Sequence, residues 1–324
     1  MTPPDGGGPG SVLVQLPGWD TRPWIDALSA HLPGRTVSLP EDGCPPGQVH
    51  YVVTFKPPSG ELGRFARLRA VFSTGAGVDG IIASGVPDGV PVLRVTGSTS
   101  TAAQVSEWVV MHSLIHLRRQ RTYDAHQRRH VWAPGRVQPV AGDLRAGVMG
   151  LGLVGAEAAR KLAAVGFDVA GWSRRPRDLA GIRTFSGDGG LEPFLARTDI
   201  LVCLLPLTPM THGLVDAALI GKMARDGVLG GPILLNAARG AIHKEHDILA
   251  ALDDGRLLAA TLDVFETEPL PAASPLWDHP RVTVTPHNAA VSSPDSVAQQ
   301  IAARIRAFEA GKGWGETTDL ARGY

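Results

Sequence analysis

The stretch GVMGLGLVG, from Gly147 to Gly155, decides the fold of this chain of 324 residues. Gly150, Gly152 and Gly155 have the spacing G-x-G-x-x-G, after a short apolar run and before helix-forming residues. In such a strand–turn–helix unit the first glycine permits the tight turn, the second lets the backbone approach a pyrophosphate, and the third allows close packing of helix on strand. The N–H groups at the start of the helix receive the anion. The motif therefore predicts a dinucleotide-binding site, although a glycine-rich chain also produces this spacing by accident.

Apolar and amphipathic segments alternate on both sides of this motif. Residues 11 to 97 have the rhythm of a small parallel sheet, and after the glycine loop six or seven strand-like runs alternate with helical ones. We therefore expect an α/β protein with two doubly wound parallel-sheet domains. A single long helix from Ser98 to about Gln127 would link them, and a helix from Ser293 to about Gly311 would fold back onto the first domain.

These boundaries predict a discontinuous substrate-binding domain, residues 1–97 with 289–324, and a dinucleotide-binding domain, residues 98–288. The two cysteines, Cys44 and Cys203, are far apart and do not suggest a disulfide framework. The first ten residues lack the features of a signal peptide, and no apolar run is long enough to cross a bilayer. We expect a cytoplasmic protein.

Charge and histidine spacing exclude some kinds of partner. Lys plus Arg and Asp plus Glu each number 31, so the net charge is zero and no field attracts nucleic acid or anionic lipid. His112 and His116 stand four residues apart, but the carboxylate that a zinc-binding pair of this spacing requires is missing between them. We expect them to pack within the helix, and we predict no metal site.

The residues after the next strand-like run, Phe167 to Trp172, indicate which nicotinamide cofactor is used. An NAD-binding protein places an acidic residue there to bind the ribose 2′-hydroxyl. Here Ser173, Arg174 and Arg175 follow instead. A hydroxyl and two guanidinium groups suit a 2′-phosphate, because arginine binds phosphate in a bidentate manner. We expect NADPH to be preferred over NADH, unless the arginines only decorate a loop.

Three charged or titratable residues follow strand-like runs in the second half of the chain: Arg239 after PILLNAA, Glu268 after AATLDVF, and His287 after RVTVTP. All three would lie at the carboxyl edge of one sheet. Reduction of a 2-oxo acid needs a cation for the substrate, a proton donor, and a partner that keeps the donor charged. A histidine beside a carboxylate supplies the last two. Each residue alone could be structural, but together they predict a catalytic site.

A glycine loop in the first half is a candidate anion site. Gly75, Ala76 and Gly77 follow the strand-like run that ends near Ser73, and consecutive backbone N–H groups there would form an anion nest. A plain glycine turn explains the loop equally well.

The chain resembles the D-isomer-specific 2-hydroxyacid dehydrogenase family. The resemblance extends from the Ser73–Asp79 loop through GLGLVG, LLPLTPMTHGLV, LLNAARGAI, ALDDGRL, LDVFETEPLP and SPLWDHPRVTVTPH. The segments WSRR, PLPAASPLWDHP and PHNAAV are most similar to the branch of glyoxylate/hydroxypyruvate reductases that use NADPH. The resemblance implies an oxidoreductase with a flavodoxin-like substrate domain and a Rossmann dinucleotide-binding domain, acting as a homodimer on a small 2-oxo acid.

The resemblance also implies roles for single residues. Arg239 matches the substrate-binding arginine, Glu268 the partner of the catalytic histidine, and His287 that acid/base. The cofactor would contact Gly150, Gly152, Leu153, Val154, Gly155, Ser173, Arg174, Arg175, Leu205, Pro206, Thr211, Ala237, Arg239, Asp263 and His287, with Asp263 receiving the nicotinamide carboxamide. The substrate would contact Gly75, Ala76, Gly77, Arg239 and His287, with Trp132 reaching in from the neighbouring subunit.

Two departures from the family and two rival functions stay open at this point. Asn288-Ala289-Ala290 stands where the family often has glycine, and Val228 to Pro232 is longer than usual. A bulkier 2-oxo acid or phosphoglycerate would be an alternative substrate. A non-catalytic dinucleotide sensor that acts as a corepressor is an alternative of another class, which the intact Arg239, Glu268 and His287 disfavour.

Overall fold

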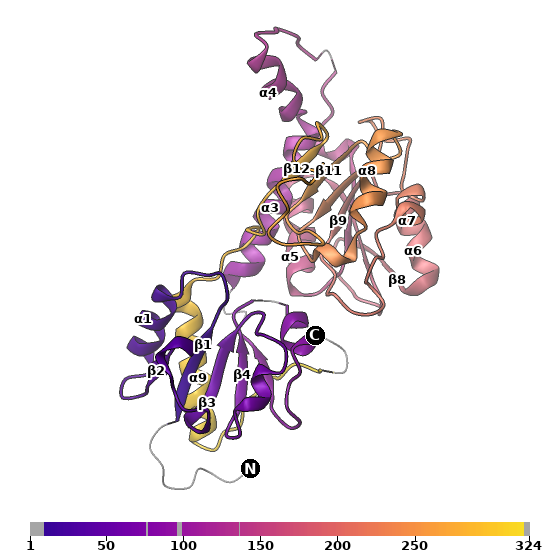
Figure 1. Ribbon diagram of the computed structural model, residues 1–324. Coiled ribbons are helices and arrows are strands. Elements are labelled where there is room, and N and C mark those ends of the chain that lie inside the picture. Colours follow the sequence, from indigo (N-terminus) through magenta and orange to yellow (C-terminus); the bar gives the residue numbers. More distant parts are fainter. Residues whose placement is uncertain (1–9, 76, 96–98, 136, 321–324) are drawn as a thin grey trace. The chain divides into compact units, whose positions relative to one another are not determined.

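The computed structural model describes residues 10–75, 77–95, 99–135 and 137–320 (Figure 1). The chain forms two compact units. The first unit combines Met1–Thr101 with Ser292–Tyr324, and the second is Ala102–Val291.

The first unit is built on a five-stranded parallel sheet with the strand order β2-β1-β3-β4-β5. Its strands are β1 (Ser11–Gln15), β2 (Val37–Ser38), β3 (Val49–Thr54), β4 (Ala70–Ser73) and β5 (Val92–Arg94). Its helices are α1 (Arg22–His31), α2 (Asp79–Ala83) and α9 (Pro294–Glu309). The order 2-1-3-4-5 is that of flavodoxin-like sheets. The predicted fold of this part is confirmed.

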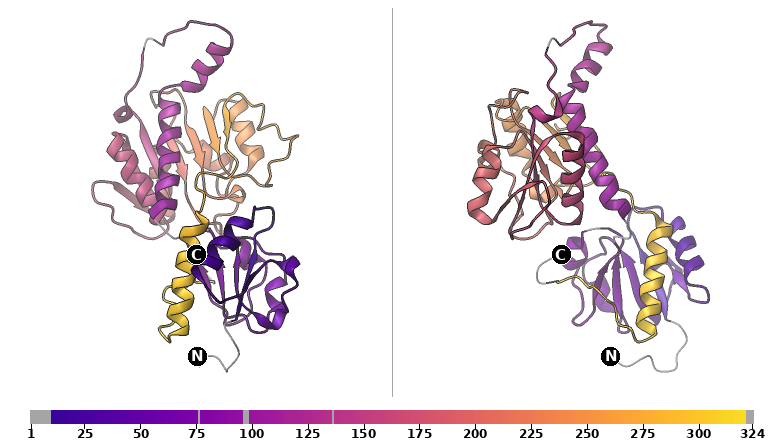
Figure 2. Two further views of the ribbon diagram at one scale, coloured as in Figure 1. Left: turned by 90° about the vertical axis from the view of Figure 1, so that its left-hand side faces the viewer. Right: turned by 180° about the vertical axis from the view of Figure 1, so that it is seen from behind.

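The C-terminal helix α9 belongs to the core of this unit. Ser293 caps it and Pro294 occupies its first turn, as the sequence predicts. Val297, Ile301 and Ile305 are buried together with side chains of β1, β3 and α1. Figures 1 and 2 show α9 beside α1 on one face of the sheet. The hydrophobic cluster on the other face includes Leu62 and Ile81 of the connecting segments.

The second unit has a seven-stranded parallel sheet with the order β12-β11-β10-β9-β6-β7-β8. Its strands are β6 (Arg145–Met149), β7 (Asp168–Ser173), β8 (Arg183–Ser186), β9 (Ile200–Cys203), β10 (Ile233–Asn236), β11 (Ala259–Leu262) and β12 (Val282–Val284). Its helices are α3 (Thr99–Leu117), α4 (Gln120–Arg128), α5 (Leu153–Val165), α6 (Gly187–Ala196), α7 (Ala217–Gly221) and α8 (Glu245–Asp253). Hydrophobic clusters cover both faces of the sheet, so the predicted doubly wound Rossmann architecture is confirmed.

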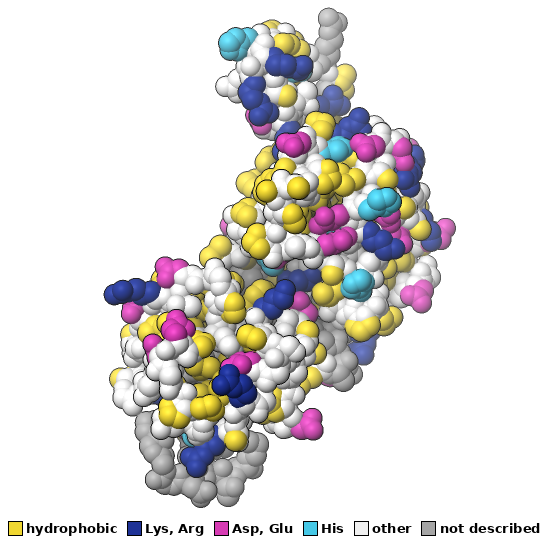
Figure 3. Space-filling view, viewed as in Figure 1, with side chains coloured by type: hydrophobic (Ala, Val, Ile, Leu, Met, Phe, Trp, Pro, Cys, Tyr) yellow, Lys and Arg dark blue, Asp and Glu magenta, His cyan; other side chains and the backbone are white. Residues whose placement is uncertain are grey.

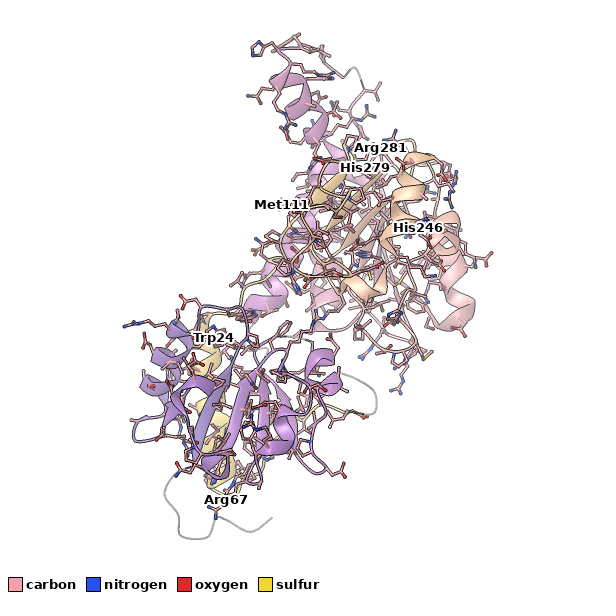
Figure 4. All side chains as sticks on the ribbon, viewed as in Figure 1. Trp24, Arg67, Met111, His246, His279 and Arg281 are labelled. Atoms are coloured by element: carbon pink, nitrogen blue, oxygen red, sulfur yellow. The ribbon has the colours of Figure 1, made fainter. Side chains whose placement is uncertain are left out.

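Side chains tie the outer strand of this sheet to its helices. Arg281, just before β12, donates from Nη1 to the carbonyl of Leu252 in α8 at 2.9 Å. Its neighbour His279 has Nε2 3.4 Å from a carboxylate oxygen of Asp253 at the end of the same helix (Figure 4). These contacts lie at the amino end of β12, whereas His287 follows the carboxyl end of the strand.

The prediction of one helix from Ser98 to about Gln127 is wrong, and Ser98 itself lies outside the described residues. The helix breaks at Arg119, whose φ of 55° is left-handed, and α4 begins afterwards. The reason is visible in the sequence RRQRTYDAHQRR, which offers no apolar stripe to pack against the sheet. None of the residues of α4 is buried.

Figure 3 shows Lys and Arg side chains interspersed with Asp and Glu over the face it draws, as the equal counts of the two signs suggest. Within the described ranges, no helix combines the length and the apolar character needed to span a membrane.

Candidate active site at the edge of the seven-stranded sheet

The predicted site residues of the second unit follow the carboxyl ends of its strands. The glycine loop follows β6, Ser173 ends β7, Leu205 follows β9, Arg239 follows β10 and His287 follows β12. All strands of this sheet run parallel, so these ends share one edge. β6 lies between β9 and β7, where the strand order reverses, and ligands bind at such a switch point.

The glycine loop is shaped by close backbone approaches. Gly150 has a φ of 106°, and its N–H donates to the carbonyl of Trp172 at 2.8 Å. A Cβ on Gly155 would overlap the carbonyl oxygen of Gly150, whereas a Cβ on Gly152 would meet nothing within 4 Å. Gly152 caps α5 without a side-chain hydrogen bond, and no acidic residue lies in the first turn. The N-terminus of α5 therefore suits an anion such as a diphosphate.

A tight bend follows β7. The hydroxyl of Ser173 donates to the carbonyl of Arg175 at 2.7 Å, so it closes the bend. The side chains of Arg174 and Arg175 are exposed, and Nη1 of Arg174 lies 3.7 Å from the sulfur of Met210. The first acidic residue after the strand is Asp178. The bend therefore places two exposed guanidinium groups ahead of the first acidic residue.

The turn after β9 is closed by a threonine. Thr211 donates from its hydroxyl to the carbonyl of Pro206 at 2.7 Å and accepts from the N–H of Thr208 at 2.8 Å. Leu205 is buried and Pro206 is exposed. The turn is therefore held by its own hydrogen bonds at the edge of the sheet.

The turn that carries Arg239 rests on a buried asparagine and a buried histidine that the sequence did not single out. The amide of Asn236 donates to the carbonyl of Arg239 at 3.2 Å and accepts from the N–H of Ala238 at 2.9 Å. It also lies 2.7 Å from Nδ1 of His243. Burial lowers the pKa of His243 to about 4, against the opposing charge of Glu268. The one signal for this network was a polar residue at the end of the apolar run PILLN.

The same turn lies directly on the segment that leads to Glu268. A Cβ on Gly240 would overlap the backbone of Phe265 and Glu266, so glycine is required there. The N–H of Phe265 in turn donates to a carboxylate oxygen of Glu268 at 3.0 Å. The Arg239 turn and the Glu268 turn are thereby packed as one unit.

His287 and Glu268 are hydrogen-bonded to each other. Nδ1 of His287 lies 2.8 Å from Oε2 of Glu268, with both side chains about one third exposed, at 34% and 35%. Burial opposes the charge of Glu268, but the hydrogen bond and charge of His287 hold the pKa of this carboxyl below its usual value. An ionised carboxylate only accepts hydrogen bonds, so Nδ1 is the donor and the tautomer of the ring is set.

Asp263 holds the turn on which His287 lies. It is 1% exposed, and its carboxylate accepts from the Thr285 hydroxyl at 2.5 Å, the Asn288 N–H at 3.0 Å and the Ala289 N–H at 2.9 Å. The N–H of His287 donates to the Asp263 carbonyl at 2.8 Å. These three hydrogen bonds of the Asp263 side chain all go to that turn.

The glycine loop of the first unit is closed by a serine. The hydroxyl of Ser73 lies 3.1 Å from the carbonyl oxygen of Gly75 and 3.0 Å from that of Gly77. The ring of Phe55 packs where a Cβ of Gly75 would lie. Ala76, also predicted to bind substrate, lies outside the described residues.

Trp132 lies apart from the edge of the sheet. Its side chain is 94% exposed, in the segment that follows α4. Together with Tyr123, His126 and His130 it lines a hollow of about 740 Å³ on this arm. The structure does not bring Trp132 to the other predicted residues. Across the part of the chain that is described, no group of three or more His, Cys, Asp or Glu could hold a metal ion.

Comparison with known proteins agrees with this arrangement. Residues 110–289 match the family model described as D-isomer specific 2-hydroxyacid dehydrogenase, NAD binding domain. The chain belongs to this family. It is therefore an oxidoreductase, and the predicted family and enzyme class are confirmed.

Other members of the dehydrogenase family are similar over nearly the whole chain. A glyoxylate/hydroxypyruvate reductase A from Serratia proteamaculans is 39% identical, covering 97% of this chain and 100% of the relative. The solved NADPH-dependent glyoxylate/hydroxypyruvate reductase of Sinorhizobium meliloti, in complex with NADP and sulfate, is 42% identical with a TM-score of 0.91, covering 98% and 100% of the two chains. A dehydrogenase from Xanthobacter autotrophicus in complex with NADPH and MES is 39% identical with a TM-score of 0.88, covering 97% and 99%.

Proposed function

We propose that this dehydrogenase reduces a small 2-oxo acid, glyoxylate or hydroxypyruvate, to the 2-hydroxy acid with NADPH. The observation that carries the proposal is the hydrogen bond of His287 with Glu268, at 2.8 Å, on the sheet edge that also holds Arg239 and the glycine loop. The relatives from Serratia and Sinorhizobium, named for these two substrates, support the choice of substrate. The first unit would bind the substrate and the second the dinucleotide.

The residues at the glycine loop fit a dinucleotide. Bound NADPH would supply the hydride that is added to C2 of the 2-oxo acid. Gly150, Gly152 and Gly155, with the N-terminus of α5, would hold its diphosphate, and Leu153, 71% exposed, would lie against it. Val154, Leu205, Pro206, Thr211 and Ala237 complete the proposed contacts along the edge, and Asp263 would receive the carboxamide.

The chain's own residues would perform the proton transfer. His287 protonates the carbonyl oxygen of the substrate, and Glu268 stabilises the imidazolium and fixes the ring through Nδ1. Arg239 orients the carboxylate and stabilises the developing alkoxide. The backbone of the Gly75–Gly77 loop, with Ala76, is the proposed substrate contact of the first unit.

The preference for NADPH over NADH rests on the bend after β7. Arg174 and Arg175 are exposed there, and the Ser173 hydroxyl shapes the bend by bonding to the Arg175 carbonyl. Two guanidinium groups favour a 2′-phosphate over a 2′-hydroxyl. The complexes of the relatives from Sinorhizobium and Xanthobacter with NADP and NADPH support this preference.

The test is the turnover of glyoxylate, hydroxypyruvate, pyruvate and a branched 2-oxo acid with NADPH and with NADH, followed by the loss of cofactor absorbance. We expect rapid turnover of the two small substrates with NADPH. His287→Ala should lower kcat by about 10²- to 10⁴-fold, because proton transfer is lost. Unimpaired turnover by His287→Ala would contradict the assignment. Tight NADPH binding without turnover of any 2-oxo acid would favour the alternative function, a non-catalytic dinucleotide sensor.

We further propose that the protein is a cytoplasmic homodimer. Both cysteines are free, which suits a reducing compartment. The arm after α4 offers an exposed Trp132 and the hollow beside it, which a second copy would cover. Light scattering should give twice the monomer mass. Trp132→Ala should raise KM for the 2-oxo acid if this ring closes the partner's site, and a monomeric, fully active wild-type enzyme would refute the homodimer.

A further inference from the structure

We propose that Trp108, on the sheet-facing side of α3, is a positioning residue for His287. It acts through Thr285 and Asp263, and touches neither substrate nor cofactor. The inference rests on the proposed role of His287 in the reaction.

The direction of each hydrogen bond in this chain of groups is set by its chemistry. Nε1 of Trp108 lies 3.2 Å from Oγ1 of Thr285, and an indole N–H only donates. Oγ1 of Thr285 lies 2.5 Å from Oδ1 of Asp263, and a carboxylate only accepts. Thr285 has one proton, so it must accept from Trp108 and donate to Asp263. The indole thereby selects the rotamer in which the hydroxyl reaches the carboxylate.

Asp263 passes this constraint to the catalytic turn. Its carboxylate also accepts from the N–H groups of Asn288 and Ala289, on the far side of His287. The turn is thus anchored before His287 by a side chain and after it by two backbone amides, all on one buried carboxylate. Hydrogen bonds to a charged group are about twice as strong as neutral ones.

The backbone of His287 needs such anchoring. Its φ is 51°, a left-handed conformation that is costly for a residue other than glycine and persists only where the surroundings impose it. If the turn relaxes, the imidazole moves relative to Glu268 and to the proposed substrate position. A misplacement of about 1 Å can cost about 10²-fold in rate.

Trp108 is itself firmly held. It is 6% exposed, and its ring packs on that of His112 at 4.5 Å between centroids. One turn earlier on α3, Gln104 accepts from the N–H of Val291 at 2.9 Å and donates to its carbonyl at 3.2 Å. Trp108 and Gln104, both on α3, therefore hold the two ends of the segment from Thr285 to Val291, which contains His287.

The test compares Trp108→Phe, which removes the N–H, with Thr285→Val, Thr285→Ser and the double variant Trp108→Phe/Thr285→Val. Trp314→Phe is the matched control, since the indole nitrogen of Trp314 is buried without a partner among the described residues. With glyoxylate and NADPH, we expect kcat of Trp108→Phe to fall about tenfold. KM for glyoxylate should stay within about twofold, because the lost interaction acts on the proton donor and not on substrate binding. Thr285→Ser should retain activity, and the double variant should lose no more than Thr285→Val.

A second readout does not depend on turnover. In protein labelled with ¹⁵N in its 11 histidines, the ring signals of His287 are those missing from His287→Ala. The chemical shifts of these signals should change in Trp108→Phe and should be the same as in the wild type in Trp314→Phe. Unmoved His287 signals, an unchanged kcat, or losses in the double variant that simply add would overturn the inference. If the wild-type enzyme reduces no 2-oxo acid, the proposed function fails, and the ¹⁵N signals alone decide on Trp108.

Discussion

Glu268 is the hydrogen-bond partner of the proposed proton donor, His287. Its carboxylate faces Nδ1 of His287, and the N–H of Phe265 holds its other oxygen. We expect Glu268→Gln to keep the fold and to lower kcat/KM by about 10²-fold, because the amide replaces the charge that stabilises the imidazolium. NADPH binding should change little.

Glu157→Gln is the control for this variant. Glu157 lies on α5 and pairs with Arg160 at 3.5 Å on the surface, an interaction of little energetic weight. Equal effects of the two substitutions on kcat/KM would show that Glu268 is no special partner of His287.

The element that we propose to bind the diphosphate of the cofactor is the turn from β6 into α5, and we expect its glycines to have separable roles. A Cβ on Gly155 would overlap the Gly150 carbonyl oxygen, so Gly155→Ala should lower the free energy of unfolding by about 1–3 kcal/mol and weaken NADPH binding. Gly152→Ala meets no atom within 4 Å and has an ordinary φ of −74°. It should leave the Tm unchanged and weaken NADPH binding alone.

Thermal unfolding and fluorescence titration with NADPH separate these effects. If the Gly152→Ala variant binds NADPH as tightly as the wild type does, the diphosphate does not bind at this turn. A Gly155→Ala variant of unchanged Tm would mean that α5 can shift away from β6 without cost.

For the whole molecule, buried histidines predict acid sensitivity. Burial lowers the pKa of His112, His116 and His243 to about 4, from an ordinary value of 6.5. The unfolded chain therefore binds protons that the folded protein excludes. The free energy of unfolding should be constant above about pH 6.5 and fall as the pH drops from there to about 4.

The measurement is urea unfolding across this pH range. His112→Leu should flatten the dependence, since neither ring nitrogen of His112 has a hydrogen-bond partner in the described structure and no such bond is lost. His246→Leu serves as the control, because this side chain, labelled in Figure 4, is 93% exposed. If the two substitutions change the pH dependence of the free energy of unfolding equally, burial of His112 is not the cause of the acid sensitivity.

Much of the architecture could be predicted because its signals are local. Apolar runs of strand length and amphipathic helical segments alternate along the chain, and right-handed crossover connections then leave few arrangements other than parallel sheets. The residues after strand ends follow from the same rule, since parallel strands release Arg239 and His287 at one edge. Their roles in the reaction stay predictions.

The sequence by itself determined the α/β class, the glycine turn into α5, the absence of an acid after β7, and the family, because each depends on residue order over a short stretch. Tertiary structure alone decided the left-handed φ of His287, the pairing of Asn236 with His243, and the path from Trp108 through Thr285 to Asp263. These features join residues up to 177 positions apart. They depend on which helices and loops contact each other once both faces of the sheet are covered. No local sequence pattern predicts these contacts.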